Sequence, residues 1–185
     1  MRVFIAIELS DELKLALTEI VLKLKKSGAD VRWVNVQGMH LTLKFLGEVD
    51  AQKELPGIEQ ALAETSAKYG SFKLVMKGTG VFPERGRPRV FWMGFSESAE
   101  LQAIQADIES RLAGLGFMAE ARPFRAHLTL GRVKGPAGLQ KAVTLSETWK
   151  EKTIGTLDVN RLILYQSILR PKGAEYKIVK DYSLQ

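Results

Sequence analysis

Two kinds of hydrophobic periodicity alternate along the chain, and together they predict strands separated by helices. Short runs rich in branched and aromatic residues indicate strands, while apolar residues three or four positions apart indicate helices. Leu13, Leu17 and Ile20 show the helical spacing most clearly. The predicted strands are residues 2–9, 31–34, 40–46, 72–81, 89–95, 127–133, 158–167 and 176–182. The predicted helices are residues 11–26, 56–69 and 101–112.

Polar and flexible residues mark the ends of these elements. Ser10 is a suitable N-cap for the first helix, and Ser27 with Gly28 ends it. Residues 82–88 indicate a loop and residues 135–138 a flexible surface connection, because both are rich in proline and glycine. The alternation of strands with a few helices predicts an α/β or α+β fold with antiparallel pairing in part.

Two short sequences occur twice with the same spacing. His-Leu-Thr-Leu stands at residues 40–43 and 127–130, and Arg-Val-Phe stands at residues 2–4 and 89–91. Both pairs are therefore 87 residues apart (127 − 40 and 89 − 2). The shared spacing indicates an internal duplication, although each sequence is also a common strand fragment.

The duplication predicts one bilobal domain over residues 1–185. Its two pseudo-symmetric halves are approximately residues 1–87 and 88–185. We expect them to face each other across a cleft, and an internal two-fold of this kind removes the need for a dimer, so we predict a monomer.

The His-Leu-Thr-Leu segments each present a polar face, because alternate residues of a strand share one side. His40 and Thr42 point one way, while the intervening leucines and Phe45 point the other. His127 and Thr129 repeat this arrangement, so a two-fold axis brings two imidazoles and two hydroxyls together. A single histidine of this kind is more often scaffolding, but the chain has 2 histidines and both lie in the repeated motif.

This set of side chains suits phosphoryl chemistry. Free imidazole has a pKa of about 6.5, so one histidine can be neutral and accept a proton while the other is charged and donates one. The threonine hydroxyls can donate hydrogen bonds to phosphate oxygens. A strained 2′,3′-cyclic phosphate is already activated, so such a site needs no metal and no other cofactor.

The composition narrows the partner and the compartment. The formal net charge of +6 favours an anionic partner such as RNA or a nucleotide, and the absence of cysteine excludes disulfides, zinc ribbons and thiol nucleophiles. No stretch approaches the roughly 20 apolar residues that span a bilayer. We therefore expect a cytoplasmic protein that does not act on membranes.

The motifs resemble those of the 2H phosphoesterase superfamily, and more narrowly the RNA 2′,3′-cyclic phosphodiesterases once described as 2′-5′ RNA ligases. The similarity is carried by RVFIAIEL at 2–9, WVNVQGMHLTLKFLGEV at 33–49, GTGVFPERGRPRVFWMG at 78–94, RPFRAHLTLGR at 122–132 and LILYQSIL at 162–169. The resemblance implies a bilobal LigT-like fold, with antiparallel-rich sheets flanking a central basic cleft. It also implies hydrolysis of RNA 2′,3′-cyclic phosphate ends, or of nucleoside 2′,3′-cyclic phosphates, to a 2′-phosphomonoester. His40 would be the proton donor and His127 the proton acceptor.

Other residues are candidates for substrate binding. Lys44 shares strand parity with His40 and can line the cleft or simply be a solvated lysine. Arg132 matches a family arginine, but strict alternation turns it away from His127 unless a bulge intervenes. Arg122 and Phe124 can frame the cleft or form a turn.

Three aromatic residues can stack on a base or belong to the core: Trp33, Phe82 and Tyr176. The arginines of residues 84–89 can guide an RNA backbone or form an ordinary solvated loop.

Three other functions compete with this interpretation. The reverse reaction, RNA ligation through a 2′-5′ linkage, shares its transition state with hydrolysis, although water greatly outnumbers RNA ends in dilute solution. A non-catalytic nucleotide- or RNA-binding module on the same fold is expected to have lost a motif residue, and this chain keeps all of them. A metal-dependent hydrolase ranks last, because neither motif contains a carboxylate.

Overall fold

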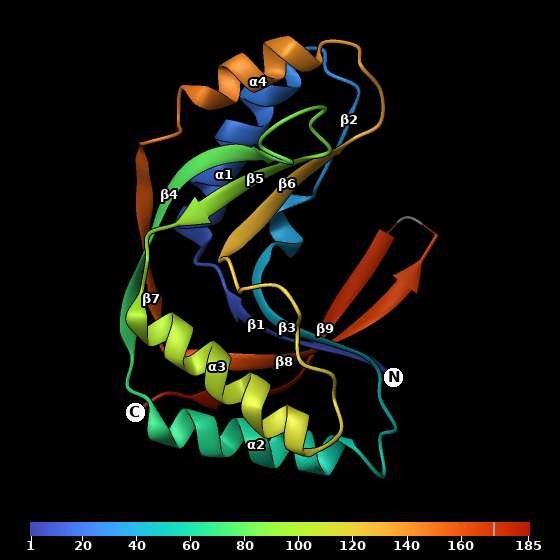
Figure 1. The fold of residues 1–185 in the computed structure, drawn as a ribbon, viewed down its shortest axis with the longest axis vertical. Coiled ribbons are helices and arrows are strands. Elements are labelled where there is room, and N and C mark those ends of the chain that lie inside the picture. Colours follow the sequence, from blue (N-terminus) through green and yellow to red (C-terminus); the bar gives the residue numbers. More distant parts are fainter. Residues whose placement is uncertain (172) are drawn as a thin grey trace.

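The computed structural model describes residues 1–171 and 173–185 and shows two lobes, each built on an antiparallel sheet (Figure 1). The strands of one sheet are, in spatial order, β3 (His40–Glu48), β1 (Arg2–Glu8), β8 (Arg161–Arg170) and β9 (Gly173–Ser183). The strands of the other are β2 (Val31–Trp33), β6 (His127–Val133), β5 (Val90–Phe95), β4 (Phe72–Phe82) and β7 (Thr153–Val159). The predicted mixed fold with antiparallel sheets is confirmed.

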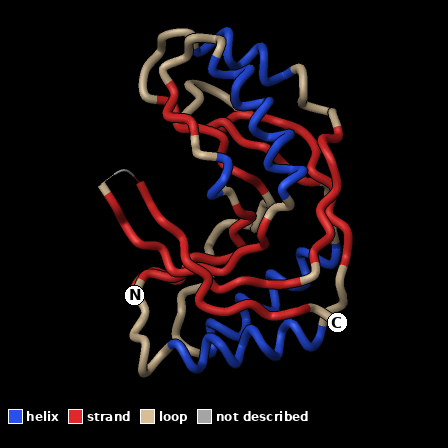
Figure 2. Tube along the Cα trace, turned by 180° about the vertical axis from the view of Figure 1, so that it is seen from behind, coloured by secondary structure: helices blue, strands red, loops and turns tan. Residues whose placement is uncertain are grey.

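The helices cover one face of each sheet and bury the core between helix and sheet (Figure 2). They are α1 (Asp11–Lys25), α2 (Leu55–Lys68), α3 (Ala99–Gly114), α4 (Leu139–Glu147) and the short 3₁₀ turn η1 (Val36–Gly38). Helices α2 and α3 pack against the sheet of β1, whereas α1 and α4 pack against the sheet of β4. As predicted, the Ser10 side chain caps α1, because it accepts a hydrogen bond from the Leu13 amide. None of the helices in the described residues is both long and apolar enough to cross a bilayer.

The strand predicted at residues 158–167 is in fact two strands. Val159 ends β7 in one sheet, and Arg161 begins β8 in the other, with Asn160 between them. The apolar pattern continues across this break because Val159 and Leu162 are both buried, each under its own sheet. Hydrophobicity alone therefore hides the point where the chain passes from one lobe to the other.

Helix α4 was not predicted from the sequence. It begins after Gly138, which has a left-handed φ of 62° and offers no side chain to cap the helix. Leu139, Ala142 and Val143 pack inward at helical spacing, but this stripe is much shorter than the one that identifies α1. The helix therefore has a short apolar stripe but no capping side chain, and the sequence analysis missed it.

Each lobe takes strands from both halves of the sequence. Strands β1 and β3 share a sheet with β8 and β9, while β2 and β4 share the other sheet with β5, β6 and β7. The predicted boundary near residue 87 therefore does not coincide with the boundary between the lobes. The internal duplication itself stays a prediction.

The repeated Arg-Val-Phe sequence does not occupy equivalent positions in the two lobes. Phe4 lies opposite Phe45, whereas the residue opposite Arg132 is Val90. Because Phe45 and Arg132 are themselves 87 residues apart (132 − 45), Phe4 corresponds to Val90 and not to Phe91. The tripeptide match is thus one residue out of register, and it does not support the duplication as the sequence suggested.

Candidate active site

The first His-Leu-Thr-Leu segment begins strand β3, whose pairing with β1 contains a β-bulge at Leu43. Thr42 lies opposite Ala6, and Lys44 lies opposite the neighbouring residue Ile5, so Leu43 has no partner of its own. A bulge of this kind adds one residue to one strand and changes the face on which the following side chains lie. Simple alternation therefore fails beyond Leu43.

The second segment begins strand β6 and contains the same irregularity at Leu130. Thr129 lies opposite Trp92, and the next residue of β5, Phe91, lies opposite Gly131. The two bulges fall at the same position of the two motifs. The backbones of β3 and β6 also approach each other, so the structure brings the two motif strands together.

The second bulge places Arg132 on the same face of the sheet as His127 and Thr129. Arg132 lies opposite Val90, two residues along β5 from Trp92, and opposite residues of an antiparallel pair share a face. The bulge that the sequence required for Arg132 to reach this face is therefore present. The Arg132 side chain is exposed to solvent.

The first bulge has the opposite consequence for Lys44, and the prediction that Lys44 lines the cleft is wrong. Its side chain is 2% exposed and lies on the helix side of the sheet, where its Nζ is 2.6 Å from an oxygen of Glu109. Phe45, predicted to point into the core, is instead 66% exposed and contacts Phe4, with ring centroids 5.8 Å apart. Both corrections follow from the extra residue Leu43.

His40 lies in an aromatic enclosure at the start of β3. Its ring is stacked on Phe4 with centroids 4.5 Å apart, and the ring of Tyr176 lies at 86° to it with centroids 4.9 Å apart. The ring of Tyr165 is stacked at 5.6 Å. These contacts bury much of the imidazole and fix the plane of its ring.

His127 has a more open environment. Its side chain is exposed, and its aromatic neighbour is Phe82, which meets the imidazole at 90° with centroids 5.7 Å apart. Phe82 is in turn stacked on Trp92, with centroids 5.2 Å apart. The two histidines therefore occupy matching strand positions but differ strongly in their exposure to water.

The two imidazoles are oriented by matching hydrogen bonds. Nδ1 of His40 is 3.0 Å from the carbonyl oxygen of Gly38, and Nδ1 of His127 is 2.7 Å from that of Arg125. Because a carbonyl oxygen only accepts, each Nδ1 carries the hydrogen and donates it. This hydrogen bond selects the tautomer and leaves Nε2 of each ring for proton transfer.

Burial lowers the pKa of one of the two imidazoles, that of His40. The pKa of His40 is lowered to about 4, chiefly because the enclosed ring loses hydration that stabilises its charged form, with the Gly38 carbonyl acting in the opposite direction. His40 is therefore neutral near pH 7 in the absence of a bound anion. Burial likewise raises the pKa of Tyr165 to about 12, so its hydroxyl keeps its proton.

A groove of about 300 Å³ opens beside His40. It combines aromatic surface from Tyr165 and Tyr176 with polar groups, and its lining residues are Glu8, Lys14, Gln37, Gly38, Met39, His40, Tyr165, Ala174, Tyr176 and Ile178. Most of these residues were not predicted. Glu8 lies opposite His40 on β1, and Lys14 lies on α1, so their place in the groove depends on folding and not on any motif.

The remaining predicted residues divide between the site and the core. Tyr176 contacts His40, and Arg122 is exposed on the segment that leads into β6. Phe124 is partly buried against the main core. Trp33 also packs there, with its ring centroid 5.5 Å from that of Phe91, so the core alternative holds for this residue.

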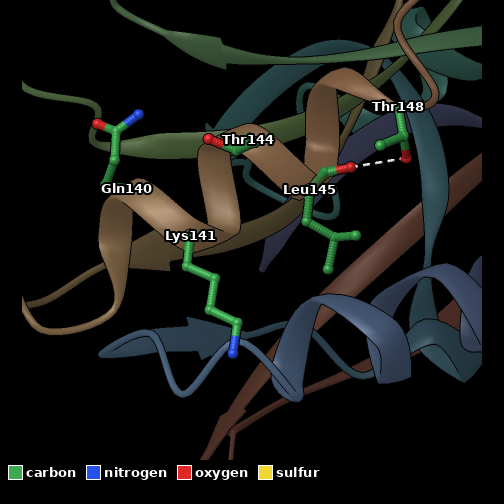
Figure 3. A pocket seen from close by; sticks show the side chains of 5 residues that line it. All are labelled: Gln140, Lys141, Thr144, Leu145 and Thr148. Atoms are coloured by element: carbon green, nitrogen blue, oxygen red, sulfur yellow. Dashed lines mark hydrogen bonds between the residues drawn. The ribbon is translucent and has the colours of Figure 1, made fainter.

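A second hollow lies on the surface of α4 and contains no residue of either motif (Figure 3). Its lining residues all come from that helix and its end: Gln140, Lys141, Thr144, Leu145 and Thr148. None of them is a histidine or a carboxylate, and Lys141 is the one titratable group among them, so the hollow offers no acid–base pair. Across the part of the chain that the structure describes, no three histidine, aspartate or glutamate side chains gather closely enough to hold a metal ion.

Known proteins are similar to this chain in both sequence and fold. The family described as LigT like Phosphoesterase matches residues 7–92 and 95–176. The RNA 2′,3′-cyclic phosphodiesterase of Thermotoga maritima is 37% identical over 98% of this chain and 94% of its own length. The protein of that name from Archaeoglobus fulgidus is 36% identical over 98% of this chain and 99% of its own length.

Solved structures agree with this assignment. A crystal structure of a Thermus thermophilus protein superposes with a TM-score of 0.83 at 28% identity and covers 100% of this chain and 98% of its own. E. coli LigT complexed with 3′-AMP superposes with a TM-score of 0.72 at 26% identity, over 99% of this chain and 97% of its own. In this chain each of the two antiparallel sheets carries one His-Leu-Thr-Leu motif. The chain belongs to the LigT-like phosphoesterase family, and it is an enzyme that hydrolyses phosphate esters.

Proposed function

We propose that the protein hydrolyses 2′,3′-cyclic phosphates at RNA ends, or on single nucleosides, to a 2′-phosphomonoester. The observation that carries this proposal is the matched orientation of His40 and His127, each held through Nδ1 by the carbonyl two residues earlier. Relatives with 31–38% identity are named for this activity, and the superposable E. coli LigT was crystallised with 3′-AMP. A nucleotide phosphate is therefore a suitable ligand for the site.

The proposed reaction uses the two Nε2 atoms as acid and base. Nε2 of His127 takes a proton from water while the water oxygen bonds to phosphorus. Nε2 of His40 gives a proton to the 3′ oxygen while the bond between that oxygen and phosphorus breaks. The products are a 2′-phosphate and a free 3′-hydroxyl, and proton exchange with water restores both rings. These steps use no metal ion and no cofactor.

The burial of His40 imposes a condition on its assignment as the proton donor. A proton donor must be charged when the substrate is bound, but the pKa of His40 in the unliganded protein is about 4. A phosphate anion beside the ring favours the imidazolium and raises its pKa. We therefore propose that the substrate itself charges His40 and so limits proton donation to the occupied site.

Other side chains then stabilise and orient the substrate. The hydroxyls of Thr42 and Thr129 can donate to the non-bridging phosphate oxygens, and the guanidinium of Arg132 can pair with their negative charge. Tyr176, at the border of the groove, offers an exposed ring for the terminal base.

The exposed arginines of residues 84–89 can attract the RNA backbone, and Arg122 and Phe124 can frame the cleft. Because one chain supplies both motifs, we propose that the enzyme acts as a monomer. We place it in the cytoplasm, where processed RNA ends arise.

The direct test uses a short RNA that ends in a 2′,3′-cyclic phosphate, incubated with the protein in EDTA. We expect complete conversion to the 2′-phosphate, identified by ³¹P NMR of the product. The same RNA with a linear 3′-phosphate is the matched control and stays unchanged. A 3′-phosphate product would show that the other oxygen leaves and would reverse the assigned geometry, and an unchanged cyclic end would refute the proposal.

A further inference from the structure

Lys44 is a buried charged group that takes no part in the proposed reaction. Its Nζ is 2.6 Å from Oε2 of Glu109 on α3 and 2.9 Å from the carbonyl oxygen of Met118. Its side chain is 2% exposed, and that of Glu109 is 15% exposed. Burial of an ammonium is costly unless it is paired and hydrogen-bonded, so both contacts are needed to keep it there.

The Met118 contact ties β3 to the segment between α3 and β6. Residues 117–126 have no helix or strand, and they cross from the lobe of α3 to the lobe of β6 (Figure 1). Within the described chain, the hydrogen bonds accepted by the backbone of this segment come from Lys44 at Met118 and from His127 at Arg125. One motif strand thus holds the beginning of the segment, and the histidine of the other motif holds its end.

The same segment carries the group that orients the His127 ring. The carbonyl of Arg125 accepts the Nδ1 hydrogen of that ring. Residues 118–123 are exposed, Met118 by 90%, so little packing restrains the middle of the segment, whereas Phe124 and Ala126 pack against the core at its end. A segment with few contacts opens readily unless specific bonds hold it.

We propose that Lys44 is a positioning residue, which anchors residues 117–126 to the first motif strand and so keeps the Arg125 carbonyl where it fixes the His127 tautomer. The duplicated bulge explains why a lysine is available for this. The residue after the bulge turns to the inner side of the sheet in both lobes, and it is Lys44 in β3 but Gly131 in β6. The contact from Lys44 to the Met118 carbonyl therefore starts from one lobe, and it holds the segment that leads into β6 of the other lobe.

The test compares variants that remove the anchor with one that disturbs a neighbouring contact. Lys44→Met removes the ammonium but leaves the Glu109 carboxylate without its partner. Lys44→Met combined with Glu109→Leu removes both charges and avoids that penalty, so it keeps the fold intact while Met118 still loses its donor. Thr65→Val is the matched control, because Thr65 links α2 to the same helix α3 through Asp107 and does not contact the segment.

Two readouts do not depend on catalysis. Trypsin cuts after Arg125 only when the segment opens, and the Arg122–Pro123 bond resists it. The loss of a charge-assisted hydrogen bond is expected to speed cleavage after Arg125 by about 10- to 100-fold in both Lys44 variants. With 2 histidines in the chain, ring ¹⁵N NMR also reports the His127 tautomer directly, and its Nδ1–H signal is expected to broaden or disappear.

The proposed positioning role builds on the proposed function, but its test stands apart from it. Faster cleavage and a changed His127 signal in the Lys44 variants, with neither in Thr65→Val, support the anchor even if the substrate is not RNA. If the double variant folds and matches the wild type in both readouts, Lys44 is a structural ion pair only and the proposal is overturned. Equal changes in Thr65→Val overturn it as well, because they point to general loosening of α3.

Discussion

Leu43 and Leu130 are the extra residues of two β-bulges that fall at the same position of the two His-Leu-Thr-Leu motifs. In each motif the histidine and threonine before the bulge share one face of the sheet. The residue after the bulge turns inward, and the next one returns to the face of the histidine. The inward position holds Lys44 or Gly131, and the returning position holds Phe45 or Arg132. The same β-bulge thus brings an aromatic ring, Phe45, to the histidine face of one sheet and a guanidinium, Arg132, to that of the other.

This geometry predicts that Arg132 contributes to substrate binding. Arg132→Ala is expected to raise KM about tenfold, because a lost charged contact to phosphate is worth roughly 1.4 kcal/mol, with a much smaller change in kcat. Steady-state kinetics on a 2′,3′-cyclic nucleotide measures both. Lys134→Ala is the matched control, because it removes an exposed positive charge just beyond the end of β6. If the two variants behave alike, Arg132 acts only through net charge.

The paired threonines are expected to act on the transition state. Thr42→Val and Thr129→Val keep the shape of the side chain and its strand preference but remove the hydroxyl, and each is expected to lower kcat roughly 10- to 100-fold. Thr→Ser at the same positions restores the donor and most of the activity. Serine variants as inactive as the valine variants would assign the threonines to packing and not to phosphate contact.

Burial of His40 predicts a specific dependence of stability on pH. The pKa is about 4 in the folded protein and near 6.5 in the unfolded chain, so the unfolded state binds more protons between these values. Above pH 6.5 His40 is neutral in both states, so its titration does not lower the free energy of unfolding there. As pH falls from 6.5 to 4, it lowers the free energy of unfolding by about 1–3 kcal/mol.

His40→Phe preserves the stacking on Phe4 and removes this titration. Urea unfolding of this variant is therefore expected to change less between pH 7 and pH 4.5 than that of the wild type. Parallel curves for the two proteins would mean that His40 is not desolvated. NMR titration of the wild type, with and without a 2′-phosphate product, measures whether the anion raises the His40 pKa as the proposed polarity requires.

The sequence was sufficient for the parts of the fold and site that have a local signal. The helical stripe and cap of α1 and the shared face of His40 and Thr42 follow from side-chain spacing and were predicted. The bulges leave no such signal, because Leu43 and Leu130 are ordinary strand residues whose extra place in the ladder depends on the partner strand. Alternation consequently misplaced Lys44.

Long-range organisation was equally hidden. Asn160 separates strands of different sheets without any loss of hydrophobic pattern, and the Arg-Val-Phe match falls one residue out of register. The aromatic enclosure of His40 combines Phe4, Tyr165 and Tyr176 from three strands, so its effect on the pKa of His40 appears only after folding. Spacing predicted that the histidines form a pair but gave no sign of how differently they are buried.

The most direct measurement of the central claim is the rate of hydrolysis of a 2′,3′-cyclic phosphate RNA in EDTA by the wild type, His40→Ala and His127→Ala. Removal of a general acid or base is expected to slow the reaction by about 10²- to 10⁴-fold in each variant. Circular dichroism confirms that the variants are folded. Activity within about tenfold of the wild type in either folded variant contradicts the two-histidine mechanism, as does a wild-type rate that disappears in EDTA.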